Sequence, residues 1–409
     1  MPAVNINEYA RISGRPVIDE LYLLADRLGG KIIQNINSTA VGGGVAEILV
    51  RMIPLLRQLG LDARWDVIKG NERFFTITKN IHNALHGKDI QLSAEDIAIF
   101  LDVNRSNAEE MDFPGDIIFI HDPQPIALVT RKAEIGKKWI WRCHIDLVQA
   151  DPAIMSFLKS YVERYDSAVF SAPAFARQDF PIPQALISPS IDPLSDKNRE
   201  LSAPEIESVA ARFNLDPDKP IVTQISRFDY LKDPVGVIKV FRKVRKYIDC
   251  QLVLAGGGAT DDPEGLQVLR EVQAEADNDP DIHVLLLPPS SDIEINALVR
   301  LSTVVLQKSI REGFGLTVSE ALWKAKPVIA SGVGGIPLQI RHQYSGILTY
   351  SIEGTAFYLK QLLQDPDYAR KLGQNGREHV KSNFLITRHI RDYLMLFITV
   401  FHNGDIIKL

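Results

Sequence analysis

The sequence is poor in cysteine and has no long apolar run. Its 409 residues include only two cysteines, Cys143 and Cys250, which lie far apart along the chain. This excludes a disulfide scaffold and fits a reducing compartment, and no cysteine–histidine cluster has zinc-site spacing. No stretch approaches the ~18 apolar residues of a membrane span, and the polar N-terminus lacks a signal-peptide core. We therefore expect a cytoplasmic protein with no membrane partner.

An excess of charge of one sign is also missing. The formal net charge is −5, which gives no electrostatic reason to expect a nucleic-acid partner. Hydrophobic residues make up 45% of the chain and charged residues 24%, which is ordinary globular usage. The length suggests about two to three domains, each able to bury a core.

Short apolar strands alternate with amphipathic helices, first before and then after a proline-rich stretch at Phe180–Lys197. This alternation is typical of parallel sheets covered by helices. We predict an α/β fold of two doubly wound, Rossmann-like domains facing a cleft, residues 1–182 and 183–384. The apolar C-terminal helix, about residues 385–409, is expected to pack back on the first domain. Such sheets bind ligands beyond the carboxyl ends of their strands.

A glycine turn flanked by two acids follows one predicted strand. It reads "EGFGLTVSE" and runs from Glu312 to Glu320. The turn includes Gly315, and a helix is expected to begin near Leu316 or Thr317, where free amides favour a phosphate. Glu320 alone could simply compensate the helix dipole, but that does not explain Glu312. Because carboxylates accept hydrogen bonds from paired hydroxyls, the pattern predicts a nucleotide-sugar site.

Two basic residues, Arg227 and Lys232, follow another predicted strand. An arginine fork and a lysine point charge suit a diphosphate leaving group. An ordinary surface pairing with Asp229 and Asp233 remains the alternative.

Polar residues also end strands in the first half. "FIHDPQP" carries His121, and "WRCHIDL" carries Arg142, His144 and Asp146. These residues interrupt strongly apolar strands, so they are candidates for binding sugar hydroxyls, although buried structural histidines are the alternative. Earlier, a turn with three glycines precedes a helix; it lacks the G-x-G-x-x-G pattern and is either an anion nest or a tight turn.

Taken together, these motifs resemble a known family. E-G-F-G-L-x-x-x-E resembles the signature of the retaining glycosyltransferases of family four, which have the two-Rossmann GT-B fold. The stretches "NSTAVGGGVAEIL", "HDPQP" and "WRCHIDL" resemble the trehalose glycosyltransferring synthases. Those enzymes join a nucleotide-activated glucose to free glucose and form α,α-trehalose. One departure is Leu338, where many relatives have an acid.

The resemblance implies a role for each matching residue. Four residues would be catalytic. Arg227 and Lys232 would neutralise the diphosphate, Glu312 would hold hydroxyls of the donor hexose, and His121 would line the sugar side of the site. Six would bind the donor, Glu320 through its ribose: Gly43, Gly44, Gly315, Leu316, Thr317 and Glu320. Three would bind or support the acceptor: Arg142, His144 and Asp146.

Retention of the α configuration allows two mechanisms. A double displacement needs a nucleophilic carboxylate near the anomeric carbon, and none stands out. The sequence therefore favours front-face attack, in which the acceptor hydroxyl approaches from the side of the leaving diphosphate. No metal or other cofactor is then required, although magnesium stays open.

Alternative functions keep the same fold. A phosphorylase that splits trehalose with inorganic phosphate is the nearest, followed by a transferase with another acceptor. A non-catalytic sugar-nucleotide sensor and a dehydrogenase are disfavoured, the first by the complete set of leaving-group residues and the second by the missing dinucleotide fingerprint. UDP-glucose, ADP-glucose and a guanine-nucleotide glucose all fit as donors, and the sequence leaves open both the reaction direction and whether the chain forms a homodimer.

Overall fold

The computed structural model describes residues 5–40, 44–257 and 263–402. The chain divides into two compact units, which we call unit 1 and unit 2. Unit 1 is Met1–Ser190 with Ile386–Leu409, and unit 2 is Ile191–Leu385. The sequence interpretation placed the two boundaries at 182/183 and 384/385. Within the described part of the chain, no helix is long and apolar enough to cross a membrane.

Unit 1 is built on a six-stranded parallel sheet of order β2-β1-β3-β4-β5-β6. Its central strands are buried, apolar runs, as expected for a sheet covered on both faces. The strands are β1 (Ile32–Asn37), β2 (Asp62–Val67), β3 (Ile117–His121), β4 (Lys138–Cys143), β5 (Ser167–Phe170) and β6 (Gln184–Leu186).

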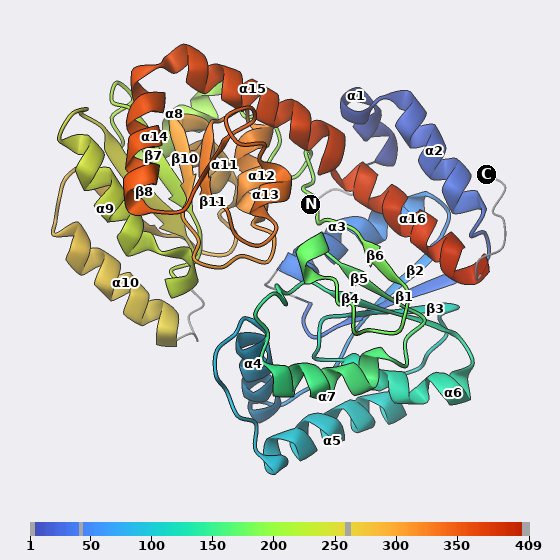
Figure 1. Cartoon of the computed structure of the whole chain (residues 1–409). Helices are drawn as coiled ribbons and strands as arrows, with labels where there is room; N and C mark the ends of the chain where they lie inside the picture. The colour runs from blue at the N-terminus through green and yellow to red at the C-terminus, as the bar shows by residue number, and fades with distance from the viewer. Residues whose placement is uncertain (1–4, 41–43, 258–262, 403–409) are drawn as a thin grey trace. The chain divides into compact units, whose positions relative to one another are not determined.

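Helices cover both faces of this sheet. In Figure 1, α2, α3 and α16 lie on one face and α4, α5, α6 and α7 on the other. The helices of unit 1 are η1 (Ile6–Tyr9), α1 (Ala10–Ser13), α2 (Arg15–Asp26), α3 (Gly44–Gln58), α4 (Glu72–Leu85), α5 (Ala94–Glu110), η2 (Ile126–Arg131), α6 (Lys132–Ile135), α7 (Pro152–Val162), η3 (Pro173–Phe175) and α16 (Ile386–His402). The C-terminal helix α16 thus belongs to unit 1, where its apolar face packs against α2.

Unit 2 repeats the arrangement with the order β12-β11-β10-β7-β8-β9, again all parallel. Its strands are β7 (Ile221–Ile225), β8 (Gln251–Gly256), β9 (Ile282–Leu286), β10 (Val304–Gln307), β11 (Val328–Ser331) and β12 (Ile347–Thr349). Its helices are α8 (Ala203–Arg212), η4 (Tyr230–Lys232), α9 (Pro234–Arg245), α10 (Pro263–Ala276), α11 (Asp292–Leu301), α12 (Leu316–Trp323), α13 (Ile336–Gln339), α14 (Ile352–Gln364) and α15 (Pro366–Asn383).

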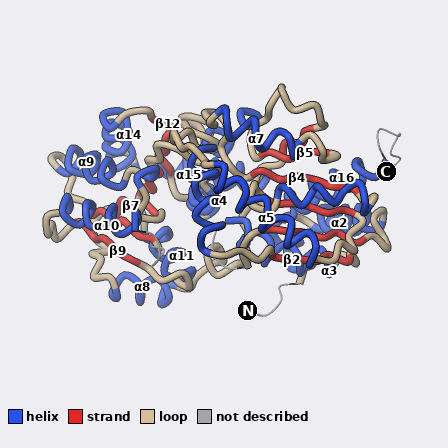
Figure 2. Tube along the Cα trace, turned by 90° about the horizontal axis from the view of Figure 1, so that it is seen from below, coloured by secondary structure: helices blue, strands red, loops and turns tan. Residues whose placement is uncertain are grey.

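The core of unit 2 forms where α9, α10 and α14 pack on one face of its sheet. Phe241 of α9, Leu306 of β10 and Leu359 of α14 are fully buried there. Helices α8, α11 and α12 cover the opposite face, and Figure 2 shows the strands of each unit lying among helices. The predicted fold class, two doubly wound α/β domains, is confirmed within each unit.

The strand orders contain one reversal in each sheet. The chain runs from β1 outward to β2 and returns to place β3 on the other side of β1; in unit 2 it runs from β7 to β8 and β9 and returns to place β10 beside β7. Loops that follow the two strands at such a reversal diverge and leave a crevice, which is where open α/β sheets bind ligands. The loops after β1 and β3, and after β7 and β10, are therefore the places to look for a site.

Two strands, β6 and β12, were not expected. The three-residue β6 pairs with β5 inside the proline-rich stretch that sequence analysis treated as a linker. Nothing in the sequence pattern indicated β6, because it has prolines on both sides and no alternation of apolar and polar residues. An edge strand such as β6 tolerates flanking prolines that a central strand would not. The observed boundary between the units accordingly comes a few residues later than the sequence suggested.

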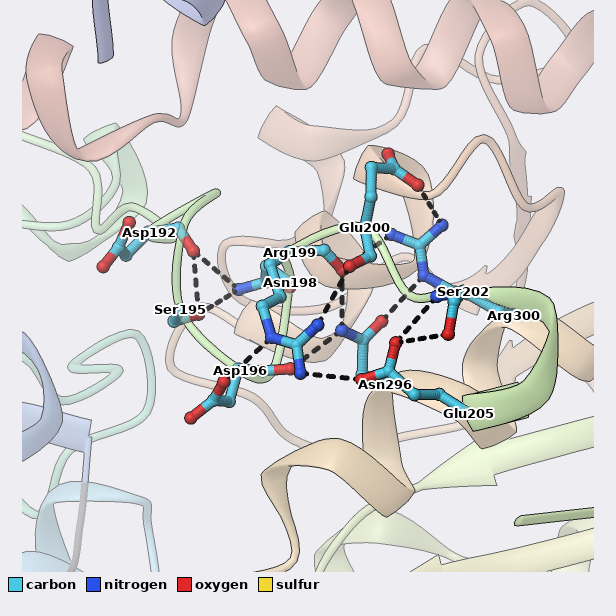
Figure 3. Close-up of polar contacts among 10 residues, drawn as sticks. All are labelled: Asp192, Ser195, Asp196, Asn198, Arg199, Glu200, Ser202, Glu205, Asn296 and Arg300. Carbon is cyan, nitrogen blue, oxygen red and sulfur yellow. Dashed lines mark hydrogen bonds and ion pairs between the residues drawn. The ribbon is translucent and has the colours of Figure 1, made fainter. Parts of the chain in front are cut away.

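Unit 2 begins with an irregular segment that polar contacts hold to α11 (Figure 3). The buried Asn296 amide donates to the carbonyl oxygens of Asp196 and Arg199, both at 2.8 Å. Arg300 adds a hydrogen bond to the Arg199 carbonyl at 2.9 Å. The Arg199 guanidinium in turn binds the carboxylates of Asp196 and Glu205. Because irregular backbone lacks the hydrogen bonds of a helix or strand, these side chains supply its partners.

Asn296→Leu tests this role. The variant keeps the side-chain volume but leaves the Asp196 and Arg199 carbonyls without the Asn296 donor, so the free energy of unfolding should fall by about 1–3 kcal/mol. Urea denaturation of the variant and the wild type measures the difference. Arg212→Ala is the control. It removes an ion pair between the exposed Arg212 side chain and Glu294 of α11, the helix that carries Asn296, and it should change stability little. Equal effects of the two substitutions would contradict the assignment.

Candidate active site

In unit 2 the loops after β7 and β10 meet through two ion pairs, Lys308 with Asp233 and Lys232 with Glu312. Lys232, at the end of η4, donates from Nζ to Oε2 of Glu312 at 2.6 Å. The two side chains are only 17% and 10% exposed. The backbone carbonyl of Lys232 also accepts a hydrogen bond from Gln224 of β7 at 2.9 Å, which holds the turn in place. Sequence analysis assigned these two residues separate roles, and the structure joins them.

Glu312 is held by more than the lysine. Its Oε2 also accepts hydrogen bonds from Ser309 Oγ at 3.0 Å and Gln307 Nε2 at 3.3 Å. Thr317 Oγ1, in the first turn of α12, donates to Gln307 Oε1 at 3.2 Å. Among the described residues, Oε1 of Glu312 accepts no hydrogen bond, so it stays available to a ligand hydroxyl. Sequence reasoning missed Gln307 and Ser309, although a buried glutamine ending the apolar strand β10 was a visible signal.

The glycine turn after Glu312 opens the N-terminus of α12. Gly315 has φ of +79°, a left-handed conformation that favours glycine, and α12 begins at Leu316 with no side-chain cap. Gly334 packs against the backbone of Glu312. A Cβ at this position would lie 1.6 Å from the Glu312 carbonyl oxygen, so only glycine fits. The uncapped amides at this helix end suit an anion, as the sequence predicted.

Arg227 and Glu320 do not join the Lys232–Glu312 pair. The Arg227 side chain is 63% exposed and contacts Asp229 at 3.2 Å, so it is free to turn toward a ligand. Glu320 is buried in α12. The predicted diphosphate and ribose roles of these two residues stay predictions.

A buried lysine, Lys324, comes directly after the last residue of α12. Lys324 donates from Nζ to the Asn198 side chain at 2.9 Å and to the Glu320 carbonyl at 3.1 Å. Burial lowers its pKa to about 7; the charge of Glu320 opposes this shift, while Arg300 adds to it. The buried position therefore disfavours the charged form of the Lys324 side chain.

In unit 1 the loops after β3 and β4 bring two histidines together. His121 Nδ1 lies 3.3 Å from His144 Nε2, and His121 Nε2 lies 3.1 Å from Asn35 Oδ1 in β1. Asp122, with φ of +64°, accepts a hydrogen bond from the backbone N–H of His144 at 2.8 Å. Burial raises the pKa of Asp122 to about 6, although this bond and Arg142 oppose the shift.

Both histidines are held neutral. Burial, aided by the Arg142 charge, lowers the pKa of His121 to about 3. Burial and the same arginine also place the pKa of His144 well below its usual value. His121 is buried, whereas His144 is partly exposed. At neutral pH these rings can donate and accept hydrogen bonds but carry no charge.

The other residues predicted on the acceptor side are less accessible. The Arg142 guanidinium is fully buried and donates to Ser171 at 3.2 Å. Asp146, also buried, accepts a hydrogen bond from the Val148 N–H at 2.9 Å and so shapes its loop. As placed, Arg142 and Asp146 support the loop, and of the three predicted acceptor-binding residues only His144 is partly exposed.

Helix α16 adds residues that the sequence did not suggest. His389 and Tyr393 are fully buried, with ring centroids 4.5 Å apart, and His389 Nδ1 lies 2.9 Å from Ser190 Oγ. Phe119 of β3 packs against Tyr393 and against His121. Gly44 begins α3 near the same strand ends, whereas Gly43 lies outside the described residues. Within the described ranges, no group of three or more histidine, cysteine or acidic side chains could hold a metal.

Comparison with known proteins identifies the family of the chain. Residues 35–177 match the family model of the trehalose synthase N-terminal domain, and residues 205–379 match that of glycosyl transferases group 1. A trehalose synthase from Rubrobacter xylanophilus is 45% identical over 95% of both chains. A trehalose phosphorylase from Pleurotus pulmonarius is 31% identical over 99% of this chain and 62% of its own length.

A solved structure from E. coli, described as trehalose-6-phosphate bound with UDP-2-fluoro glucose, shares the fold. Its TM-score is 0.74 at 14% identity, covering 92% of this chain and 99% of that one. The fold and the family matches define a glycosyltransferase of the GT-B class, a hexosyltransferase enzyme. Within that class, the chain belongs to the trehalose synthase family, as its motifs indicated.

The buried Lys324 predicts a pH dependence of stability. Its pKa is about 7 in the folded chain against an ordinary 10.5, so between these values the unfolded chain binds more protons. Stability should therefore rise with pH in this range, by at most about 1.4 kcal/mol per unit for one group. In Lys324→Met this contribution disappears and the slope flattens. Chemical denaturation between pH 7 and 10 tests it, with exposed Lys371→Met as the control; an unchanged slope in Lys324→Met would count against a buried ammonium.

Proposed function

We propose that this chain transfers glucose from a nucleoside-diphosphate glucose to free glucose, reversibly and with retention, and so forms α,α-trehalose. The observation that carries the proposal is the Lys232–Glu312 contact beside the uncapped end of α12. It sets a cation for the leaving diphosphate next to a carboxylate for the donor hexose. The family membership supports trehalose as the product, and the UDP-2-fluoro glucose bound to the E. coli protein of the same fold supports a nucleotide-sugar donor.

The proposed reaction is a front-face displacement. The acceptor hydroxyl forms the new C1–O bond on the face from which the diphosphate leaves, and its proton passes to a phosphate oxygen. Lys232, Arg227 and the amides at Leu316 and Thr317 stabilise the charge that develops on the diphosphate. Glu312 holds donor hydroxyls in place, since positioning both sugars lowers the barrier that separate diffusion would impose.

No metal is needed in this scheme, because two side-chain cations and a helix N-terminus already oppose the diphosphate charge. Magnesium stays an open addition, to be settled by assay with and without a chelator. The cytoplasmic location and a homodimer also stay predictions.

Phosphorolysis of trehalose is the second candidate, and the Pleurotus pulmonarius relative is the observation that favours it. The same cations and helix end would then hold inorganic phosphate. Release of glucose from trehalose that depends on phosphate and needs no nucleotide would support this alternative.

A donor panel is the first test. UDP-, ADP- and GDP-glucose are each offered with glucose, and the linkage of the product is determined by NMR. We expect α,α-1,1-linked trehalose from at least one donor, together with the free nucleoside diphosphate. If no donor gives this product while phosphate alone releases glucose from trehalose, the chain is a phosphorylase.

Arg227→Ala and Lys232→Ala test leaving-group stabilisation. Each should lower kcat by about a hundredfold or more, because a charge that stabilises the transition state is lost. Arg212→Ala is a matched control for Arg227, since both side chains are about equally exposed and each contacts one carboxylate. Wild-type turnover in both test variants would reject the proposed role.

Glu312→Gln tests the carboxylate without dismantling its surroundings. A glutamine oxygen can still accept hydrogen bonds from Lys232, Ser309 and Gln307, so the variant should fold with a nearly unchanged melting temperature. Its weaker hold on the sugar should abolish most transfer from the donor that the panel identifies. Unchanged steady-state kinetics would rule out a sugar-binding role for Glu312.

A further inference from the structure

The buried asparagine in β1 is bonded to the histidine pair. Asn35 is 3% exposed and lies in a strand whose other buried residues are two isoleucines and two polar residues. In the parallel register it faces Phe119 of β3, so its side chain lies on the face that also carries His121, two residues further along. This explains how a residue far away in sequence reaches the His121 ring.

The orientation of the Asn35 amide is fixed by its second contact. Asn35 Nδ2 donates to the backbone carbonyl of Arg64 in β2, at 3.3 Å. A carbonyl oxygen only accepts hydrogen bonds, so the amide atom facing it must be the nitrogen. The atom facing His121 is therefore the amide oxygen, which also only accepts.

The amide oxygen then determines both histidine tautomers. Because Oδ1 of Asn35 accepts, His121 must carry its proton on Nε2. With the ring neutral, Nδ1 of His121 is unprotonated, so His144 must donate to it from Nε2. His144 is neutral as well, which leaves its Nδ1 as a lone pair. No described residue makes a hydrogen bond to that atom, and His144 is a partly exposed residue.

We infer that Asn35 is a positioning residue, which acts through His121 to present Nδ1 of His144 as a hydrogen-bond acceptor for a hydroxyl of the acceptor sugar. The inference rests on the proposed function for the identity of the sugar, but not for the tautomers. A ring in the opposite tautomer would offer an N–H instead, and it would bind a hydroxyl only through that oxygen's lone pair. We call the hydrogen-bonded chain of Asn35, His121 and His144 the relay. The relay thus determines that the sugar hydroxyl donates its proton to His144 rather than accepting one.

The charged and titratable groups around the relay keep it neutral. Arg142 from β4 disfavours a proton on either ring, and Asp122 is held by the His144 backbone N–H. From α16, His389 and Tyr393 pack nearby, and burial lowers the pKa of the first and raises the pKa of the second, so both are neutral at pH 7. The wild-type tautomers should therefore not change across the working pH range.

The decisive measurement is the tautomer of His144 in the whole protein without sugar. In the ¹⁵N-histidine-labelled enzyme, the ring-nitrogen shifts of His144 are assigned by their loss in His144→Gln. We expect a protonated Nε2 and an unprotonated Nδ1 from pH 6 to pH 8. A proton on Nδ1 overturns the inference but leaves the proposed function standing. Conversely, if no donor yields trehalose, the proposed function fails while the tautomer remains readable.

Two substitutions connect the tautomer to activity. Asn35→Leu removes the acceptor, so His144 should populate both tautomers and kcat/KM for glucose should fall about tenfold, the effect of one hydrogen bond. In Asn35→Asp the carboxylate should raise the pKa of His121; once His121 gains a second proton, its Nδ1 donates to His144 and the lone pair on Nδ1 of His144 is lost. Glucose kcat/KM should therefore drop toward acid pH in this variant alone.

Asn107→Leu is the matched control. Asn107 is another buried asparagine of unit 1, bonded to the backbone of Lys69 and to no histidine. This variant should lose stability but keep the His144 tautomer and the KM for glucose. If Asn35→Leu changes only the melting temperature, as Asn107→Leu does, Asn35 is merely structural and the inference fails. If neither Asn35 variant folds, the wild-type tautomer alone decides.

Discussion

The reversal of strand order in each sheet determines where this protein can gather polar groups. In unit 2, β7 and β10 are neighbours although β8 and β9 separate them in sequence. Their loops therefore meet, and Lys232 comes within 2.6 Å of a glutamate 80 residues further along the chain. Neither loop alone contains the pair. The sheet topology creates it, and the turn bonded by Gln224 keeps it in place.

The same constraint in unit 1 gathers groups of a different kind. Here β1 lies beside β3, and Asn35, His121 and His144 form a chain of hydrogen bonds with no net charge. Unit 2 thus supplies charged side chains and an uncapped helix end, while unit 1 supplies neutral donors and acceptors. In the proposed reaction, charge develops on a diphosphate whereas sugar hydroxyls need orientation, so each of the two kinds of group would have its own task.

Periodicity predicted the repeating strand–helix pattern, because buried parallel strands and amphipathic helices leave strong local signals. The start of α12 at Leu316 was also predictable, from the glycine before it. The strand β6 was not, since three edge residues among prolines carry no pattern. Nor were Asn35 and His389, whose partners depend on strand register and on where α16 docks.

The surroundings of Glu312 bear on how configuration would be retained. A nucleophilic carboxylate needs an oxygen whose lone pairs are free to attack carbon. Oε2 of Glu312 instead accepts from Lys232, Ser309 and Gln307, which spreads its charge over three donors. Of the two carboxylate oxygens, only Oε1 accepts no hydrogen bond from the described residues. In the proposed reaction this carboxylate holds donor hydroxyls rather than attacking carbon, a role that would leave departure and attack on the same face of the sugar.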